Sequence, residues 1–262
     1  MGIFDSFIQR LPLYLLSMPV VLMALSVHES AHGYVAYKLG DPTARNLGRI
    51  TLNPVKHFDL FGFLCMLLVR FGWAKPVPIA TRNFKNPRRD MAITGAAGPI
   101  SNLLLAIINL IVLRLFMIFI AHQYSGEVAE FKFALYFYDG GFTGTLGFTM
   151  CALLAYLLYL GVVMNVMLAI FNLIPVPPFD GSRIFYVFLP TKWYFAVMKY
   201  ERYIMMGFFV LLVFGFLDGP LGIAENFITG GLMSLAGMGD KTEIGSLRYT
   251  LEVYVYRLLK LI

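Results

Sequence analysis

The sequence predicts a polytopic α-helical membrane protein, and its composition supports that prediction in two ways. Of its 262 residues, 59% are hydrophobic and 14% are charged, whereas soluble domains contain about 45–50% apolar and about 25% charged residues. One soluble core of this size could not bury so much apolar surface. The hydrophobic residues also form long uncharged runs, as membrane-spanning helices require. The two cysteines, Cys65 and Cys151, provide no disulfide framework.

Three uncharged runs approach or exceed the length of about 20 residues that a spanning helix needs. With their flanking residues, they predict spans at about 11–36, 91–120 and 144–174. We expect these three helices to form the core of a domain that covers residues 1–190.

The residues after this core predict one or two further hydrophobic segments and a tail. Residues 191–239 contain two shorter runs that are almost free of charge. In residues 240–262, apolar side chains recur at helical spacing with charged residues between them, which predicts an amphipathic helix. Two interpretations of this tail stay open. It either lies on the lipid surface or packs against a partner chain in a homo-oligomer.

The connection between the first two spans is expected to contain β-structure at residues 44–80. Residues 44–53 place apolar side chains among polar ones as a strand does, and the prolines of residues 72–80 favour an extended backbone. We therefore predict a small sheet or β-hairpin associated with the membrane. A plain surface loop is the alternative.

The distribution of basic residues predicts how the chain crosses the membrane. Ten Lys and Arg residues lie between the first two spans, and one, Lys132, lies between the second and third. Short loops rich in Lys and Arg stay in the cytoplasm. The first connection is therefore expected inside and the second outside, in a multi-pass protein of the cytoplasmic membrane. The net charge of +6 is interpreted as this orientation signal and not as a surface for nucleic acid.

The sequence His28-Glu29-Ser30-Ala31-His32 carries the clearest chemical signal. Residues four apart on a helix share one face, so both imidazoles can reach one Zn²⁺ while Glu29 lies beside them as a general base. The alternative is a pair of histidines satisfied by hydrogen bonds at a helix end. Ionisable residues at the end of an apolar helix are costly unless they serve a site, which favours the metal.

A catalytic zinc has three protein ligands and one open position, so a third ligand is needed on the cytoplasmic side. Asp180 lies where the third span returns to that side. The prolines before it are expected to give an extended approach, and Gly181 to permit a tight turn after it. An ordinary turn aspartate is the alternative. Weaker candidates on the same side are Asp41, His57 and Asp59. The predicted topology excludes the groups on the outer side: His122, Glu127, Glu130, Asp139 and Cys151.

At this point the residues resemble a known family. An HExxH sequence at the inner end of one span, with N-x-x-P-x-P-P-x-D-G at residues 172–181, looks like the site-2 protease family of intramembrane zinc metalloproteases. Residues 72–78 (GWAKPVP) and 95–102 (GAAGPISN) are similar to segments of its bacterial and archaeal members. The resemblance implies that His28, His32 and Asp180 bind zinc and that Glu29 is the general base. The PDZ or CBS domain of many members has no room in this sequence.

Two asparagines and one short segment are further candidates for contact with substrate. Asn102 follows a Gly-Pro pair that is expected to begin the second helix, and Asn172 lies near the level of Asp180. Each side chain either donates to the oxyanion or to substrate backbone, or it satisfies a broken helix end or joins two helices. In the expected sheet, an unwound substrate would add as a strand along a short edge. That edge consists of Arg49, Ile50, Thr51 and Leu52.

The combined prediction is an intramembrane zinc metalloprotease with one Zn²⁺ per chain. Its active site faces the cytoplasm, and its expected partners are the bilayer and substrates that are single-span membrane proteins or resemble signal peptides. A zinc-binding scaffold without catalysis and a polytopic transporter are the alternatives. Glu29 favours an enzyme over a scaffold. A transporter needs ionisable groups near the middle of several spans, whereas here they gather at one face.

Overall fold

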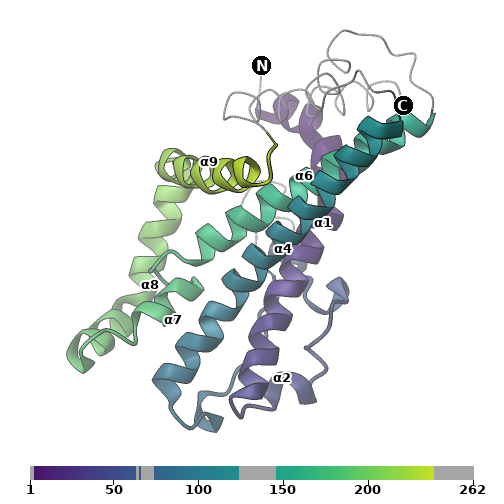
Figure 1. Ribbon diagram of the computed structural model, residues 1–262. Coiled ribbons are helices and arrows are strands. Elements are labelled where there is room, and N and C mark those ends of the chain that lie inside the picture. Colours follow the sequence, from purple (N-terminus) through teal and green to yellow (C-terminus); the bar gives the residue numbers. More distant parts are fainter. Residues whose placement is uncertain (1–2, 63–64, 66–73, 124–145, 239–262) are drawn as a thin grey trace. The chain divides into compact units, whose positions relative to one another are not determined.

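The computed structural model describes residues 3–62, 65, 74–123 and 146–238, and helices dominate them (Figure 1). The predicted helical class is confirmed in these residues. The long helices are α1 (Ile3–Lys38), α4 (Pro87–Gln123), α6 (Leu146–Asn172), α8 (Thr191–Val213) and α9 (Asp218–Leu235). The short elements are α2 (Thr43–Asn46), η1 (Pro54–Lys56), η2 (Thr81–Asn83) and α7 (Asp180–Phe185).

Two of the described helices are long and apolar enough to cross a membrane. They are α4 over Pro87–Ile120 and α6 over Leu153–Asn172, which overlap the second and third predicted spans. Helix α1 runs unbroken through residues 11–36. That criterion does not select α1, so the first span stays a prediction.

Helix α4 differs from the prediction in where it begins. It starts at Pro87 and continues through Pro99 without a break, so the expected helix start at Gly98-Pro99 is wrong. Proline is compatible with the first turn of a helix, because the N–H that it lacks has no intrahelical partner there. Pro87 therefore suits the start of α4.

The predicted sheet or β-hairpin is not found among the described residues of 44–80. Residues 43–46 form α2, residues 54–56 form η1, and residues 74–80 are extended without strand pairing. Side chains of α1 hold this connection instead. The Ser30 hydroxyl donates to the Thr51 carbonyl at 2.6 Å and accepts from the Thr51 N–H at 3.2 Å. A backbone that is bonded to side chains in this way cannot use the same groups in a strand ladder.

The chain divides into two compact units, each of which has its own packing. One comprises Met1–Val21, Leu105–Met164 and Asn226–Ile262, and the other Leu22–Leu104 and Asn165–Glu225. In the first unit, α4 and α6 contribute a buried apolar cluster that includes Leu113, Ile120 and Val162. The second unit contains every residue of the site described below.

Two helices follow the core, where one or two further hydrophobic segments were predicted. Helices α8 and α9 occupy residues 191–213 and 218–235. The expected amphipathic tail at 240–262 and the expected outer loop with Lys132 lie outside the described residues.

Candidate metal centre

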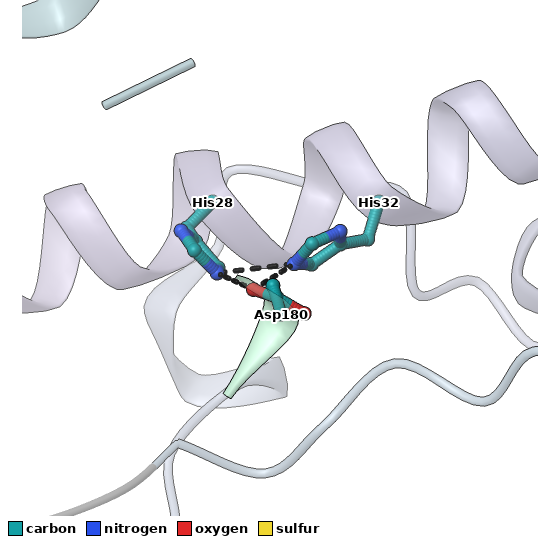
Figure 2. Close-up of side chains that lie close together, drawn as sticks. All are labelled: His28, His32 and Asp180. Atoms are coloured by element: carbon teal, nitrogen blue, oxygen red, sulfur yellow. Dashed lines mark hydrogen bonds and ion pairs between the residues drawn. The ribbon is translucent and has the colours of Figure 1, made fainter. Parts of the chain in front are cut away.

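His28, His32 and Asp180 bring one ligating atom each to the same point (Figure 2). The two histidines lie one turn apart on α1, and Asp180 is the first residue of α7. The Nε2 atoms of the imidazoles are 3.0 Å apart, and Asp180 Oδ2 is 3.0 Å from each of them. All three residues are buried. In the part of the chain that the structure describes, no other group of three His, Cys, Asp or Glu residues is found with this arrangement.

The segment before Asp180 is bent and not extended as predicted. Residues 173–179 form turns, with Val176 N–H donating to the Ile174 carbonyl and Phe179 N–H donating to the Val176 carbonyl. Gly181 is needed for close approach and not for a tight turn, because it lies inside α7. A Cβ atom there would collide with the backbone of Leu173 and Ile174. The loop therefore folds back directly onto the start of α7.

The other nitrogen of each imidazole has an oxygen partner. The Nδ1 of His32 is 2.7 Å from the Thr94 carbonyl, and the Nδ1 of His28 is 2.5 Å from Asn102 Oδ1. The Asn102 amide orientation is assigned from its other bonds, because Nδ2 lies 2.7 Å from Asn165 Oδ1 and 3.2 Å from the Ala24 carbonyl. Both Nδ1 atoms therefore carry the proton and donate it, which leaves an Nε2 lone pair on each ring.

This donor set fits a zinc ion. Two Nε2 lone pairs and one carboxylate oxygen converge with no proton between them, and such a set repels itself until a cation binds. In a tetrahedral site with ligand distances of about 2.0–2.1 Å, the ligand atoms lie about 3.3 Å apart. The observed separations of 3.0 Å are close to that value.

Asp180 is held in its charged form. Its second oxygen, Oδ1, lies 3.6 Å from the Arg183 guanidinium. The two oxygens thus face different partners, with Oδ2 toward the imidazoles.

Helix α4 approaches the two imidazoles through a glycine. A Cβ atom on Gly98 would lie 2.5 Å from Nε2 of both His28 and His32. Gly95, one turn earlier, faces α7 in the same way, because a Cβ there would lie 3.2 Å from the Arg183 Cβ. The glycines of residues 95–98 therefore leave the space that the metal and its ligands need.

Glu29 lies on α1 between the two histidines, and its carboxylate is held by the backbone. The Val77 N–H donates to Glu29 Oε2 at 2.8 Å. Val77 belongs to the extended residues 74–80, which therefore pass beside the HExxH turn. The carboxylate is half-buried.

The other predicted site residues lie in different surroundings. The Asn172 amide donates to the Leu168 carbonyl of its own helix at 2.9 Å. The segment Arg49, Ile50, Thr51 and Leu52 forms no strand edge, because Thr51 is bonded to Ser30. The weaker metal candidates are bonded to nearby backbone. Asp41 and Asp59 each accept a hydrogen bond from a backbone N–H, and His57 Nε2 is bonded to a backbone carbonyl.

Several residues of the site were not singled out from the sequence. Thr94 contributes a backbone carbonyl, and Val77 a backbone N–H, which no side-chain pattern reveals. Asn165 had a visible signal, because it is a buried amide inside the uncharged run at 140–179. Polar groups in such a run usually have a partner there. Gly98 belongs to a segment already noted for its resemblance, but its packing role needed the structure.

Comparisons with known proteins found one matching family model and similar proteins that are named as zinc metalloproteases. The model of Peptidase family M50 matches residues 17–215. A protein of Bacillus subtilis (strain 168) named "Putative zinc metalloprotease YwhC" is 38% identical over 194 residues, which are 74% of this chain and 78% of that protein. "Putative zinc metalloprotease Rip2" of Mycolicibacterium smegmatis (strain ATCC 700084 / mc(2)155) is 30% identical over 99 residues, 36% of this chain and 38% of its own. No solved structure matches the chain.

Replacing Gly98 with alanine is expected to abolish zinc binding. The new methyl group would occupy the space of both Nε2 atoms, so the variant should retain less than about a tenth of the wild-type zinc. Zinc is measured by elemental analysis of protein purified in detergent. Gly207→Ala is the matched control, because a Cβ on that α8 glycine meets nothing within 4 Å. Wild-type zinc in Gly98→Ala would contradict the geometry.

Replacing Asn102 with alanine is expected to weaken zinc binding without abolishing it. The His28 Nδ1–H loses its acceptor, and loss of such an outer partner typically lowers metal affinity 10–100-fold. The affinity is measured by competition with a chromophoric chelator. Asn172→Ala removes an amide bonded within its own helix and should change the affinity less than about twofold. Equal affinities in the two variants would argue against a role for Asn102 in orienting His28.

Proposed function

This chain belongs to peptidase family M50, and we propose on that premise that it is an intramembrane zinc metalloprotease. It cleaves a peptide bond within or near the membrane-spanning segment of its substrates. The observation that carries the proposal is the convergence of His28, His32 and Asp180 beside Glu29. The two apolar helices α4 and α6 support a site built at membrane depth.

In this proposal His28, His32 and Asp180 hold the metal, and Glu29 is the general base. Zinc, when bound, supplies a Lewis acid that polarises the scissile carbonyl and activates water. Glu29 takes a proton from the attacking water and passes it to the leaving amine. Asn102 and the Thr94 carbonyl hold the imidazole rings so that their Nε2 atoms stay aimed at one point.

The proposed substrates are single-span membrane proteins and peptides that resemble signal peptides. A transmembrane helix has its carbonyls bonded internally, so the scissile segment must unwind before Glu29 can direct water to its carbonyl. We propose that this occurs toward the cytoplasmic face, because ten basic residues lie between the first two predicted spans.

Glu29→Gln is expected to abolish proteolysis while leaving zinc bound. The amide keeps the size of the side chain but cannot take the proton from water, and general-base catalysis contributes about 10²–10⁴-fold in rate. The assay is cleavage of a single-span test substrate by purified protein in detergent. Glu201→Gln is the control, because Glu201 is exposed on α8 and should keep full activity.

Three outcomes separate the proposal from its alternatives. Cleavage by the wild type and by Glu201→Gln, but not by Glu29→Gln, supports the enzyme. Equal cleavage by all three would assign the activity to a contaminant. Zinc binding without cleavage by any of them, on a panel of single-span substrates, would leave a zinc-binding membrane scaffold.

A further inference from the structure

The extended residues 74–80 present one backbone donor to the proposed general base. Pro76 and Pro78 flank Val77, and proline has no N–H. Val77 is therefore the sole backbone donor of residues 76–78, and it donates to Glu29 Oε2 at 2.8 Å. A proline on each side also restricts the backbone conformations of this stretch, because the residue before a proline is confined to extended conformations.

The side chain of Val77 holds the same stretch against α1. It is 7% exposed, and a Cβ built on Gly33 would lie 3.3 Å from its Cγ1. Gly33 lies one helical turn after Glu29, so the valine packs on α1 next to the carboxylate that its N–H contacts. The backbone N–H and the side chain of Val77 therefore contact neighbouring turns of α1.

Hydrogen bonds at both ends keep residues 74–80 in place. At one end, Lys75 N–H donates to the His57 carbonyl at 2.8 Å, and the Arg49 guanidinium donates to the Lys75 carbonyl at 2.8 Å. At the other end, Ala80 N–H donates to Asp41 Oδ2 at 2.7 Å. The partners in these bonds, His57, Arg49 and Asp41, all lie in the connection after α1.

Asp41, which holds the end at Ala80, is itself held by several hydrogen bonds. Its side chain is fully buried and also accepts from the Thr43 backbone N–H and from the Asn83 amide. Burial alone would raise the pKa of this carboxyl, but the hydrogen bonds hold the pKa below its ordinary value. A buried carboxylate with this many donors resists displacement, because hydrogen bonds to a charged group are stronger than those between neutral groups.

We infer that residues 74–80 form a positioning strap for Glu29, in which the Val77 N–H holds Oε2 and leaves Oε1 to receive the proton from water. This inference rests on the proposed protease function. A carboxylate on a flexible side chain offers either oxygen in several rotamers, whereas a strapped carboxylate offers one. Among the described residues, no hydrogen bond to Oε1 is found, which agrees with a free oxygen. Val77 is thus a positioning residue that acts through Glu29.

The direct test removes the N–H and keeps the strap. Val77→Pro deletes the donor at a position already confined to extended conformations by Pro78. Val77→Ala is the matched control, because it keeps the N–H and loses side-chain packing. We expect Val77→Pro to lower kcat on the order of 10-fold or more, a share of what general-base catalysis supplies. KM and zinc content should stay at wild-type values, and Val77→Ala should keep kcat within about threefold.

A second measurement does not depend on catalysis. In protein labelled with ¹⁵N-valine, the Val77 amide resonance, assigned by its absence from Val77→Ala, should move upfield in Glu29→Ala because its charged acceptor is gone. Glu201→Ala should leave it unchanged. An unmoved resonance in Glu29→Ala overturns the strap even in a preparation without activity.

The kinetic outcomes are equally decisive. If Val77→Pro and Val77→Ala have the same kcat, or if Val77→Pro loses zinc or raises KM in place of lowering kcat, the strap is wrong as stated. Failure of the proposed function looks different. The wild type then cleaves no more than Glu29→Gln, and the resonance measurement alone decides whether Val77 holds the carboxylate.

Discussion

The convergence of three electron-pair donors at one point organises the second unit of this protein. Two neutral imidazoles and a carboxylate, all buried, lie 3.0 Å from one another. Such an arrangement is unfavourable without a cation, because lone pairs and a negative charge face each other in a medium of low dielectric constant. The fold must therefore hold the ligands together, and binding of zinc would repay that free energy.

The neighbouring chain segments meet this demand in three ways. Asn102 and the Thr94 carbonyl accept the Nδ1 protons and so direct both Nε2 atoms toward Asp180. Gly98 gives the imidazoles room, and Gly181 lets residues 173–174 approach α7 closely. The connection after α1 adds the Val77 N–H beside Glu29. Metal ligands, their orienting partners and the proposed base are thus fixed by different segments around one helix.

How well the sequence predicted the structure depended on how far apart in the sequence the interacting residues lie. The HExxH spacing is local, so helical geometry alone places His28 and His32 on one face. Asp180 lies 148 residues after His32. The basic loops predict which helix ends lie on the same side of the membrane, and this favours Asp180 as the third ligand. The structure brings Asp180 to the two histidines. Helices α4 and α6 were predictable because hydrophobic run length is a strong signal.

The failures concern backbone groups bonded to distant side chains. The alternation around Ile50 indicated a strand, but Leu47 and Leu52 are 61% and 57% exposed, and Ser30 holds the Thr51 backbone. The prolines before Asp180 predict an extended approach, whereas residues 173–179 form turns and bends. For Asn102, in contrast, the alternative that it joins helices agrees with the contacts of its amide, which bonds to His28 and Ala24 of α1 and to Asn165 of α6. No local periodicity encodes such pairings.

We propose that the imidazoles of His28 and His32 and the carboxylate of Asp180 hold zinc. X-ray absorption at the zinc edge of the purified wild-type protein tests it most directly. We expect nitrogen and oxygen ligands at about 2.0–2.1 Å, with the scattering pattern of two imidazole rings. A sulfur shell at about 2.3 Å, which would indicate cysteine ligation, or a spectrum without two imidazoles would contradict it.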